Sequence, residues 1–551
     1  MRSGDEVLFR GGTVFDGTRF LPAGTCVRVR NGKIAEVGPA AEVGPAAVAG
    51  AAEVVDLAGG TLLPGFIDAH AHPVFAGRQL RECDLRRATN AAGYLELIAA
   101  YARAHQDEEW ITGGGWSMDA FPGGRPDRHA LDAVVSDRPV YLPNRDGHGA
   151  WVNTRALELA GISTATPDPA DGRIERDSSG QPMGTLQEGA TALVSRLLPK
   201  VSESDWYEAL LAAQEHLLSF GITGWQDAIV GSYLGEADPM AAYLSAAGAG
   251  TLKATVAGAL WWDRARGLDQ LPELLERRRI GQSGRFRATS VKMMLDGVAE
   301  NHTAAMLEPY LDGDGCDSGH AGLDFIDPAE LPRFVTALDA EGFQVHFHAL
   351  GDRAVRNALD AVEAARTASG TRVLRHHLAH LQVVHPDDIP RFAQLSATAN
   401  IQALWATHEP QMDELTIPFL GERRSGWQYP FGSLLGTGAP LCAGSDWPVS
   451  SPNPLWGMHV AVNRSLPASA GGHGGDPFLP GQALSLPAAL AAYTSGSARV
   501  NGMSDVAGAI RAGLDADFAV VDADLAHLPT AEICQASVRQ TWVRGDLAYQ
   551  Q

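Results

Sequence analysis

Eight short apolar segments follow one another along this 551-residue chain, and most end in polar residues of the kinds that catalyse reactions or bind metals. They read FIDAHAH, GITGWQD, LKATVAGAL, ATSVKMMLDG, GFQVHFHALGD, LRHHLAHLQ, ATANIQALW and LCAGSDWP. Stretches with apolar residues at helical spacing lie between them, for example SDWYEALLAAQEHLLSF and PAELPRFVTALDAEG. Alternating strands and helices predict an α/β fold with a parallel sheet, and eight strands are the number that closes a (β/α)8 TIM barrel.

The two ends of the chain have a different pattern. Residues 1–62 and 500–551 contain short runs rich in Val, Leu and Phe, broken by Gly and Asn-Gly turn signals. We therefore predict a small β-sandwich domain built from both termini, flanking a barrel at residues 63–499. Residues 94–200 are too long and too rich in Gly and Pro for one crossover helix. They predict an inserted subdomain that covers the barrel mouth and shapes the substrate pocket; the alternative is an elaboration that does not contact the site.

The charge and the cysteine content of the chain argue against some binding partners and against disulfide bonds. The formal charge of −22 argues against a nucleic-acid surface, because phosphate binding needs clustered Lys and Arg. The five cysteines are scattered without a CxxC pair, which argues against disulfides and cysteine-zinc sites. The N-terminus lacks an apolar signal region, and no apolar run approaches the roughly 20 residues that span a bilayer. We expect a soluble cytoplasmic protein with a small-molecule substrate and no membrane partner; the frequency of homo-oligomers favours a homodimer.

Two histidines stand one residue apart in GFIDAHAHP, at the end of the first apolar segment. On a strand, the side chains of His70 and His72 point to the same side. The carboxyl ends of all strands in a TIM barrel meet at one mouth, where metal ligands gather. The pair alone is equally consistent with two structural polar residues, so the interpretation depends on partners at other strand ends.

Lys292 lies inside the otherwise apolar fourth segment, in SVKMMLDG. A buried ammonium group is costly unless it is paired or modified. Carboxylation by CO2 would turn this lysine into an anionic oxygen ligand able to bridge two metal ions. The alternative is an ion pair with a carboxylate such as Asp296.

Further imidazoles come from the fifth and sixth segments. QVHFHALGD contains His346 and His348, and HHLAHLQ contains His376, His377 and His380. We choose His348 and His380 as metal ligands because each lies nearest the end of its strand. The other three are expected to support the ligands or to pack in the core.

Asp446 ends the eighth segment, in AGSDWPVSS. A carboxylate there can bind a metal while it accepts a proton from the attacking water, whereas the alternative is a helix N-cap or loop aspartate. Neutral imidazoles and carboxylates suit Zn2+ or a similar divalent ion. The sequence therefore predicts a site for one or two ions, with Asp446 as the catalytic residue.

The ordered set GFIDAHAHP, VKMMLDG, HFHALGDRAV, AHLQVVHPDDI and GSDWPV resembles the amidohydrolase superfamily. More narrowly, it resembles amidohydrolase family 3, the YtcJ-like branch that includes N-substituted formamide deformylases. The β-rich ends and DGHGAWVNTRALELAGI extend the resemblance over nearly the whole chain. The resemblance implies a metal-binding set in which Lys292 is the N6-carboxylated bridge and Asp446 is both ligand and proton shuttle; the set is His70, His72, Lys292, His348, His380 and Asp446.

The chain departs from the family pattern at three places. Ala379 precedes His380 where relatives have Glu, and Gln226 stands where a His is more usual. His302 follows the LDG of the fourth segment, where relatives have an Arg or Ser before Thr-Ala. These differences leave the metal ligands in place and leave the substrate preference open.

Four residues outside the ligand set are candidates for substrate binding: Trp116, His148, Glu188 and His302. Each has a structural alternative. Trp116 would pack as a buried aromatic, and His148 would belong to a turn. Glu188 would be a solvated residue at a helix start, and His302 a loop histidine.

The predicted activity is metal-dependent hydrolysis of a non-peptide C–N bond, an amide of a small molecule, by a metal-activated water. An N-substituted formamide is one such substrate. Hydrolysis of an ester, a lactone or a cyclic amide with the same metals is the alternative within the enzyme class. A non-catalytic binding protein would be expected to have lost at least one ligand, and all six are present.

Overall fold

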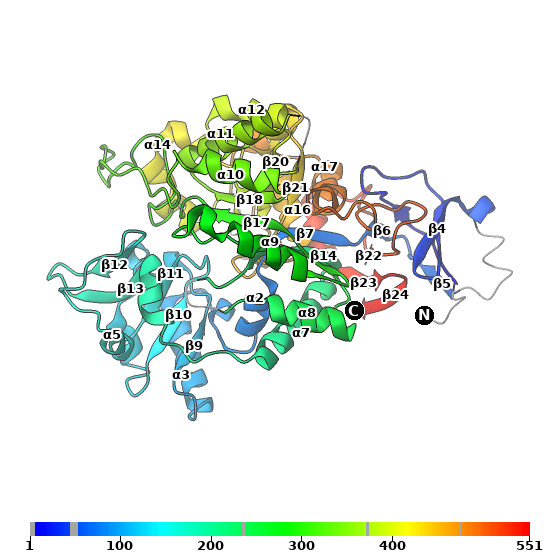
Figure 1. Ribbon diagram of the computed structural model, residues 1–551. Coiled ribbons are helices and arrows are strands. Elements are labelled where there is room, and N and C mark those ends of the chain that lie inside the picture. Colours follow the sequence, from blue (N-terminus) through cyan, green and yellow to red (C-terminus); the bar gives the residue numbers. More distant parts are fainter. Residues whose placement is uncertain (1–5, 44–52, 234–236, 371–373, 471, 473–474) are drawn as a thin grey trace.

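A computed structural model describes residues 6–43, 53–233, 237–370, 374–470, 472 and 475–551. Its central element is a sheet of eight parallel strands that curls into a nearly closed barrel (Figure 1). In hydrogen-bonded order these are β7 (Phe66–Ala71), β14 (Ile222–Val230), β15 (Thr255–Trp261), β17 (Phe286–Met294), β18 (Gln344–Ala349), β19 (His377–His380), β20 (Thr398–Ile401) and β21 (Leu441–Ala443). A two-residue strand, β16 (Gln282–Ser283), pairs with β17 outside this path. The predicted TIM-barrel fold is confirmed, and each strand overlaps one of the eight apolar segments.

The barrel closes where its last strand meets its first. Bonds beyond the strand ends join the two: the backbone N–H of Asp446 donates to the oxygen of His70 (2.7 Å), and that of His72 donates to the oxygen of Trp447 (2.8 Å). The side-chain amide of Asn400, on β20, also donates to the oxygen of Ala69 on β7 (2.9 Å). The seam therefore lies beside three predicted metal ligands, His70, His72 and Asp446.

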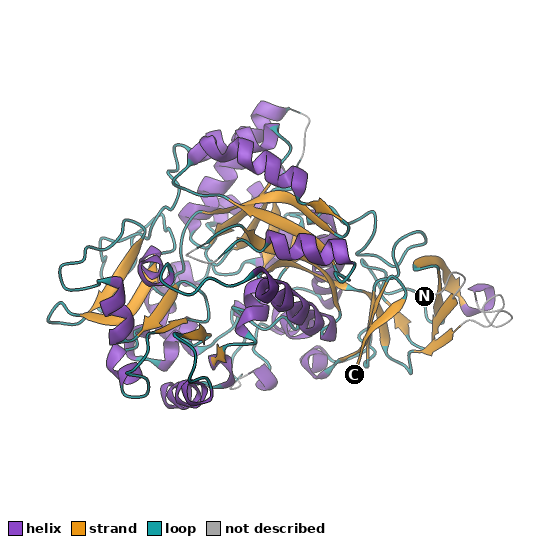
Figure 2. Ribbon diagram, turned by 60° about the horizontal axis from the view of Figure 1, so that its bottom comes forward, coloured by secondary structure: helices purple, strands orange, loops and turns teal. Residues whose placement is uncertain are grey.

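Helices cover the outside of the barrel (Figure 2). The longer ones are α7 (Glu203–Ser219), α8 (Met240–Ala249), α9 (Leu271–Ile280), α10 (Leu331–Ala340), α11 (Asp352–Ser369), α12 (Ile389–Leu395), α14 (Ile417–Ser425) and α16 (Pro454–Asn463). Helix α7 shows why such segments are helical: Ser202 and Asp205 form a reciprocal capping box at its start, and Trp206, Leu210 and Leu217 recur on its buried face.

Both ends of the chain contribute strands to two neighbouring sheets. One sheet has the order β4 (Lys33–Pro39), β3 (Thr25–Arg30), β1 (Glu6–Arg10) and β5 (Glu53–Asp56). The other has the order β2 (Thr13–Val14), β6 (Thr61–Pro64), β22 (Phe518–Val521), β23 (Val538–Val543) and β24 (Asp546–Gln550). Phe9 packs edge-on against Phe518 and Trp542, with ring centroids 5.1 and 5.2 Å apart, so residues from both termini share one core.

The insertion forms its own sheet, in the order β12 (Gly172–Arg176), β13 (Pro182–Glu188), β11 (Gly149–Val152), β10 (Val140–Pro143), β9 (Ile111–Gly114) and β8 (Cys83–Asp84). Helices α3 (Ala91–Ala104) and α5 (Thr154–Ala160) accompany it, so the unit begins somewhat before residue 94. The insertion and the terminal β domain lie on opposite sides of the barrel (Figures 1 and 2). None of the helices in the described ranges is long and apolar enough to cross a membrane.

Candidate metal centre

A cavity of about 170 Å³ lies at the carboxyl ends of the barrel strands. Part of its wall comes from the insertion, through residues 143–149, and apolar side chains such as Tyr233 and Trp405 form much of the rest. All six residues of the predicted ligand set line it: His70, His72, Lys292, His348, His380 and Asp446. The fold therefore brings together residues that are up to 376 positions apart, and the insertion does contact the site.

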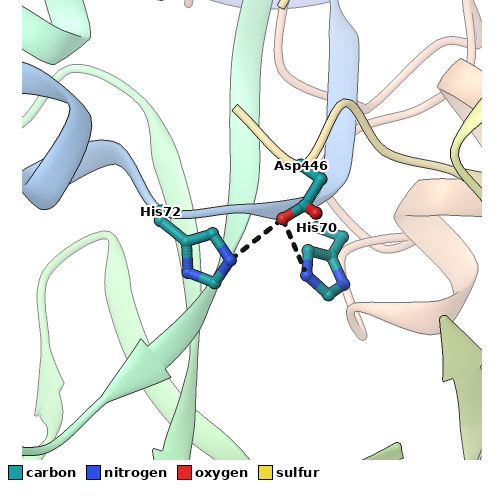
Figure 3. Close-up of side chains that lie close together, drawn as sticks. All are labelled: His70, His72 and Asp446. Atoms are coloured by element: carbon teal, nitrogen blue, oxygen red, sulfur yellow. Dashed lines mark hydrogen bonds and ion pairs between the residues drawn. The ribbon is translucent and has the colours of Figure 1, made fainter. Parts of the chain in front are cut away.

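His70, His72 and Asp446 form the tightest group in this cavity (Figure 3). The Oδ1 atom of Asp446 lies 3.2 Å from Nε2 of His70 and 3.0 Å from Nε2 of His72. Burial alone would raise the pKa of the Asp446 carboxyl, but the bond from His72 and the nearby His380 hold it below its usual value. Asp446 is therefore a carboxylate at neutral pH.

The local backbone explains how these three side chains meet. Asp68, on the same strand as His70, accepts hydrogen bonds from the backbone N–H groups of His70 and Ser445, both at 3.0 Å, and one from the Ser445 hydroxyl. These bonds hold the end of β7 against the segment after β21. Asp446 itself has a φ of 56°, a left-handed conformation that is costly for a residue other than glycine.

Lys292 is 2 % exposed and lies at the seventh position of β17, with its side chain on the cavity. Burial lowers the pKa of its amine to about 7, against the opposing effect of Asp446. Lys292 does not form the alternative ion pair with Asp296. Asp296 instead accepts backbone N–H groups from Ala305, Leu350 and Gly351, at 2.8–3.1 Å.

His348 and His380 complete the set from strands β18 and β19, with ring centroids 4.5 Å apart. Burial, the neighbouring histidines and Lys292 keep the pKa of both rings well below the usual value, so both are neutral, as metal ligands must be. His348 lies 3.3 Å from the oxygen of Gly297 through its Nε2. His380 has a φ of 79°, and its backbone N–H donates to Gln402 (2.7 Å).

Gln402 is a supporting residue that belongs to no sequence motif of the site. Its amide donates to Asn400 (3.0 Å), and Asn400 in turn donates to the backbone of β7, so one chain of amides links strands β19, β20 and β7. Asp68 is another supporting residue. In the sequence, Asp68, Asn400 and Gln402 can be noticed only as polar residues within otherwise apolar segments.

The remaining histidines of strands β18 and β19 lie beneath the ligands. Nε2 of His346 is 2.9 Å from Nδ1 of His70, and the His346 ring contacts that of His377 (4.1 Å between centroids). His376 points away, with Nε2 at 2.9 Å from Asp339. His346 and His377 thus orient the ligand layer, while His376 fastens the start of β19 to helix α10.

The residues present fit a divalent cation. Ligand atoms of His70, His72 and Asp446 all lie within 4.8 Å of one another. Two donors each about 2.0–2.2 Å from a tetrahedral ion stand roughly 3.3–3.5 Å apart, close to the observed separations. Within the described part of the chain, the buried Nδ1 atoms of His72 and His380 lack hydrogen-bond partners. Buried polar nitrogens are normally satisfied, so an ion-binding role accounts for imidazoles left in this state.

A second polar cluster, centred on His148 and Glu188 of the insertion, lies beside the cavity. Nδ1 of His148 lies 2.9 Å from a carboxylate oxygen of Glu188, and the His148 ring is 5.3 Å from that of His348. Glu188 also accepts hydrogen bonds from Thr303 (2.6 Å) and Asn301 (3.4 Å). Burial would lower the pKa of His148, but the charge and hydrogen bond of Glu188 outweigh it and raise that pKa to about 9.

The four candidate substrate-binding residues therefore differ in position. His148 lines the cavity, and Glu188 supports it from behind as a buried carboxylate rather than a solvated one. Trp116 is fully buried in the core of the insertion, where its Nε1 donates to the oxygen of Leu142 (2.8 Å). His302 stacks on Tyr310 and Phe419 with centroids 5.0 and 4.4 Å away. The latter two occupy the packing and loop positions of their structural alternatives.

A TIM barrel with imidazoles and a carboxylate gathered at its carboxyl end is the architecture of a metal-dependent hydrolase. The comparisons with known proteins agree. The chain belongs to the amidohydrolase family, whose family model matches residues 53–549.

Curated relatives match over most of the chain. "Protein LONG AFTER FAR-RED 3" of Arabidopsis thaliana is 30 % identical over 99 % of this chain and 91 % of its own length. "Putative amidohydrolase YtcJ" of Bacillus subtilis is 28 % identical, over 99 % of both chains. "N-substituted formamide deformylase" of Arthrobacter pascens is 31 % identical over 95 % of this chain and 94 % of its own. These matches confirm the resemblance to the YtcJ-like branch.

The fold has solved counterparts. An uncharacterized metal-dependent hydrolase from Pyrococcus horikoshii aligns with a TM-score of 0.70 and 25 % identity, over 93 % of this chain and 96 % of its own. Family, fold and the His70–His72–Asp446 cluster together support a hydrolase that uses a divalent metal.

Proposed function

We propose that this protein hydrolyses a non-peptide C–N bond, the amide bond of a small molecule, and that N-substituted formamides are the first substrates to test. The observation that carries the proposal is the contact of one carboxylate, Asp446, with two imidazoles in a largely apolar cavity. The relative named as an N-substituted formamide deformylase supports this choice of substrate class.

The metal of the proposal is Zn2+, as one or two ions. His70, His72 and Asp446 would hold the first, and His348 and His380 would hold a second, with Lys292 between them. A bound divalent ion supplies a water of lowered pKa and polarises the substrate carbonyl.

Asp446 is the proton carrier of the proposed reaction. Its contacts with His70 and His72 use Oδ1, which leaves the other carboxylate oxygen for the proton of the attacking water. The same group then returns that proton to the departing nitrogen. The lowered pKa of Asp446 keeps it ready as a base at neutral pH.

Lys292 is proposed to carry a carboxylate on its Nζ. The amine attacks CO2, a new N–C bond forms, and one proton is released to solvent. A pKa near 7 supports the step, because a large share of the amine is then the neutral nucleophile. The described residues also offer this amine no ion-pair partner within 4.0 Å, and the neutral imidazoles of His348 and His380 lie in the same cavity.

His148 is proposed to donate a hydrogen bond to the carbonyl oxygen of the substrate. Its Nδ1 is engaged by Glu188, and its ring lies on the cavity wall beside His348. Held as an imidazolium by Glu188, it presents Nε2–H towards the cavity. Such a donor stabilises the negative charge that develops on the carbonyl oxygen in the transition state.

Asp446→Asn tests the proposal. The amide keeps an oxygen for metal contact but cannot accept the proton, so we expect at least a 100-fold loss of kcat with most of the metal retained. Asp387→Asn is the control, because that side chain is 86 % exposed and does not line the cavity. The variants are compared by metal analysis and by release of formate from N-substituted formamides. Full turnover by Asp446→Asn would rule out the proton carrier.

The bond type is tested separately with a panel of amides, esters, lactones and cyclic amides. We expect the highest kcat/KM for an amide. A preference for another class by an order of magnitude would replace the amide in the proposal. Less than about one equivalent of metal and no turnover of any class would favour a binding protein.

A further inference from the structure

A second cavity, of about 540 Å³, lies at the opposite end of the barrel. Its wall includes residues at the beginnings of the parallel strands: Thr255 is the first residue of β15, Arg287 the second of β17 and Gln344 the first of β18. Lys33 and Arg544 reach it from the terminal β domain. The cavity is therefore distinct from the metal centre, which lies at the carboxyl ends of the same strands.

The lining of this cavity is basic although the whole chain is acidic, with a formal charge of −22. Five cationic side chains and one carboxylate belong to it: Lys33, Arg285, Arg287, Arg375, Arg544 and Asp515. Like charges gathered around one space repel one another, and this costs stability unless a counter-charge enters. The fold retains the cluster nonetheless.

Carboxylates of the protein balance only part of this charge. Nζ of Lys33 lies 2.5 Å from Asp515, and Nη2 of Arg285 lies 3.4 Å from Asp517. Among the described residues, the side chains of Arg287 and Arg375 form neither an ion pair nor a hydrogen bond. Two guanidinium groups thus face the cavity without a carboxylate.

A buried amide points to the same conclusion. Asn501 lines the cavity and is only 7 % exposed, yet neither its Nδ2 nor its Oδ1 has a hydrogen-bond partner among the described residues. The buried Nε of Arg285 is in the same state. An unsatisfied buried polar atom destabilises the protein, so a ligand that bonds to these atoms gains affinity directly. Water could satisfy the amide but would not neutralise the arginines.

We propose that this cavity binds a small dianion that carries a phosphate group or carboxylates. Guanidinium groups suit both because their paired N–H donors match the spacing of oxygens in these anions. The hydrogen-bond donors for the anion are the guanidinium groups of Arg287 and Arg375, the amide of Asn501 and the Nε–H of Arg285. The space exceeds that needed for one phosphate ion, so the natural ligand is a small organic molecule bearing such a group.

The bound anion would connect two parts of the molecule. Arg287 and Arg375 belong to the barrel, whereas Lys33 and Arg544 belong to the terminal β domain. An anion shared between them stabilises the junction and does so only in the folded protein. The site is thus a stabilising or effector site, independent of the hydrolytic reaction.

The test uses the metal-loaded full chain with inorganic phosphate and with succinate as probes, at constant ionic strength set by NaCl. We expect the better probe to raise Tm by about 2 °C or more at saturation and to show saturable binding in calorimetry. A response to phosphate alone identifies a phosphoryl ligand, and a response to succinate alone identifies a dicarboxylate. Equal Tm values in phosphate, succinate and NaCl would overturn the proposal.

Two single variants locate the site: Arg287→Ser and Arg375→Ser. Both side chains are exposed at the rim, so the fold should tolerate their loss. Each is expected to weaken binding at least 10-fold and to leave kcat/KM for the substrate unchanged. Arg103→Ser, on the exposed face of α3, is the matched control and should bind normally.

Asn501→Leu removes the unpaired amide while keeping a similar volume, and it should also weaken binding. Wild-type affinity in all three cavity variants would place the anion elsewhere and refute the proposal. Inhibition that is competitive with substrate would assign the anion to the catalytic cavity instead. That result would leave the hydrolytic proposal intact, so the two hypotheses fail separately.

Discussion

His380 and Asp446 both have positive φ angles, of 79° and 56°, at the ends of their strands. A residue other than glycine in this region costs of order 1–3 kcal/mol and persists only where its surroundings enforce it. For His380 the enforcing contact is the bond from its N–H to Gln402, and for Asp446 it is the bond to the oxygen of His70. The strain aims both side chains into the cavity, which a regular strand end would not do.

Glu188 provides a prediction at the scale of one residue. Glu188→Gln removes the charge that keeps His148 protonated, so the pKa of His148 should fall from about 9 towards and below its ordinary value. We expect kcat/KM to fall about 10- to 100-fold at pH 8, because a hydrogen bond to a charged group is worth roughly 1.5–3 kcal/mol. The alkaline limb of the pH–rate profile should also move to lower pH.

The control for this change is Glu175→Gln. Glu175 is likewise a buried glutamate of the insertion, but it pairs with Arg173 and Arg125 and does not line the cavity. Its variant should keep the wild-type pH profile. An unchanged profile for a folded Glu188→Gln protein would contradict the role of His148 as an imidazolium donor.

At the scale of elements, the contact between β7 and β21 decides the geometry of the metal centre. A Cβ added at Gly444 would lie 2.5 Å from the backbone nitrogen of His70 and 3.0 Å from a carboxylate oxygen of Asp68. Gly444→Ala should therefore push the two strand ends apart. We expect a destabilisation of about 1–3 kcal/mol, typical of overpacking, together with weaker metal binding.

Gly436→Ala is the matched control for the seam, because a Cβ there meets nothing within 4 Å and the residue is exposed in helix α15 (Phe431–Gly436). It should leave both properties unchanged. Thermal unfolding and metal titration measure the outcome. If Gly444→Ala retained the wild-type Tm and metal affinity, the seam would not constrain the ligands.

Strand β14 carries a buried carboxyl group whose ionisation links stability to pH. Burial raises the pKa of Asp227 to about 6, although the Tyr243 hydroxyl donates to it at 2.6 Å. In the unfolded chain this pKa is close to 3.9. The folded state therefore binds the extra proton between about pH 4 and 6, and stability falls as pH rises through this window. The contribution is at most about 3 kcal/mol.

Asp227→Asn should remove this contribution, so its stability relative to wild type should increase from pH 4.5 to pH 7.5. Urea unfolding of the metal-free proteins at the two pH values measures the difference. Asp387→Asn serves as the reference for loss of an exposed carboxylate. A relative stability that did not change with pH would show that Asp227 is not protonated in the folded state at pH 4.5.

The sequence predicts the barrel well because each strand is a short apolar run that ends in polar residues, and that pattern is local. The same local pattern places the proposed ligands at one mouth, because each lies in or at the end of such a run. It does not predict the bond between His148 and Glu188, whose partners are 40 residues apart, in the bend before β11 and at the end of β13. Nor does it predict the amides of Asn400 and Gln402, because a buried amide has no sequence motif and its value depends on the partner that the fold supplies.

At the scale of the whole molecule, the two cavities lie at opposite ends of one barrel and draw their walls from different flanking units. The insertion contributes to the metal centre, and the terminal β domain contributes to the basic cavity. Substitutions in either flanking unit should consequently affect one cavity and spare the other. The barrel strands, which reach both, are the route by which ligands at either end change the stability of the whole.

Metal removal is the prediction for the molecule as a whole. The proposed ligands come from five strands of one barrel, so bound metal would connect β7, β17, β18, β19 and the end of β21. Ligand binding to the folded state alone stabilises by about 2.7 kcal/mol when the free ligand is at 100 times its Kd. We expect chelation to lower Tm by several degrees and Zn2+ to restore it. His70→Asn should have a low Tm that neither treatment changes.

Reconstitution then separates the role of Lys292 from that of the metal. If Lys292 must be carboxylated, protein stripped of metal in CO2-free buffer should regain full activity only when Zn2+ and bicarbonate are both present. Zn2+ alone should restore less than about one tenth of it, because an uncarboxylated lysine supplies no anionic oxygen between the ions. Lys292→Arg cannot form the carbamate and should stay inactive under both conditions. Full recovery with Zn2+ alone would show that the lysine acts unmodified and would leave His348 and His380 as the whole of the second ligand group.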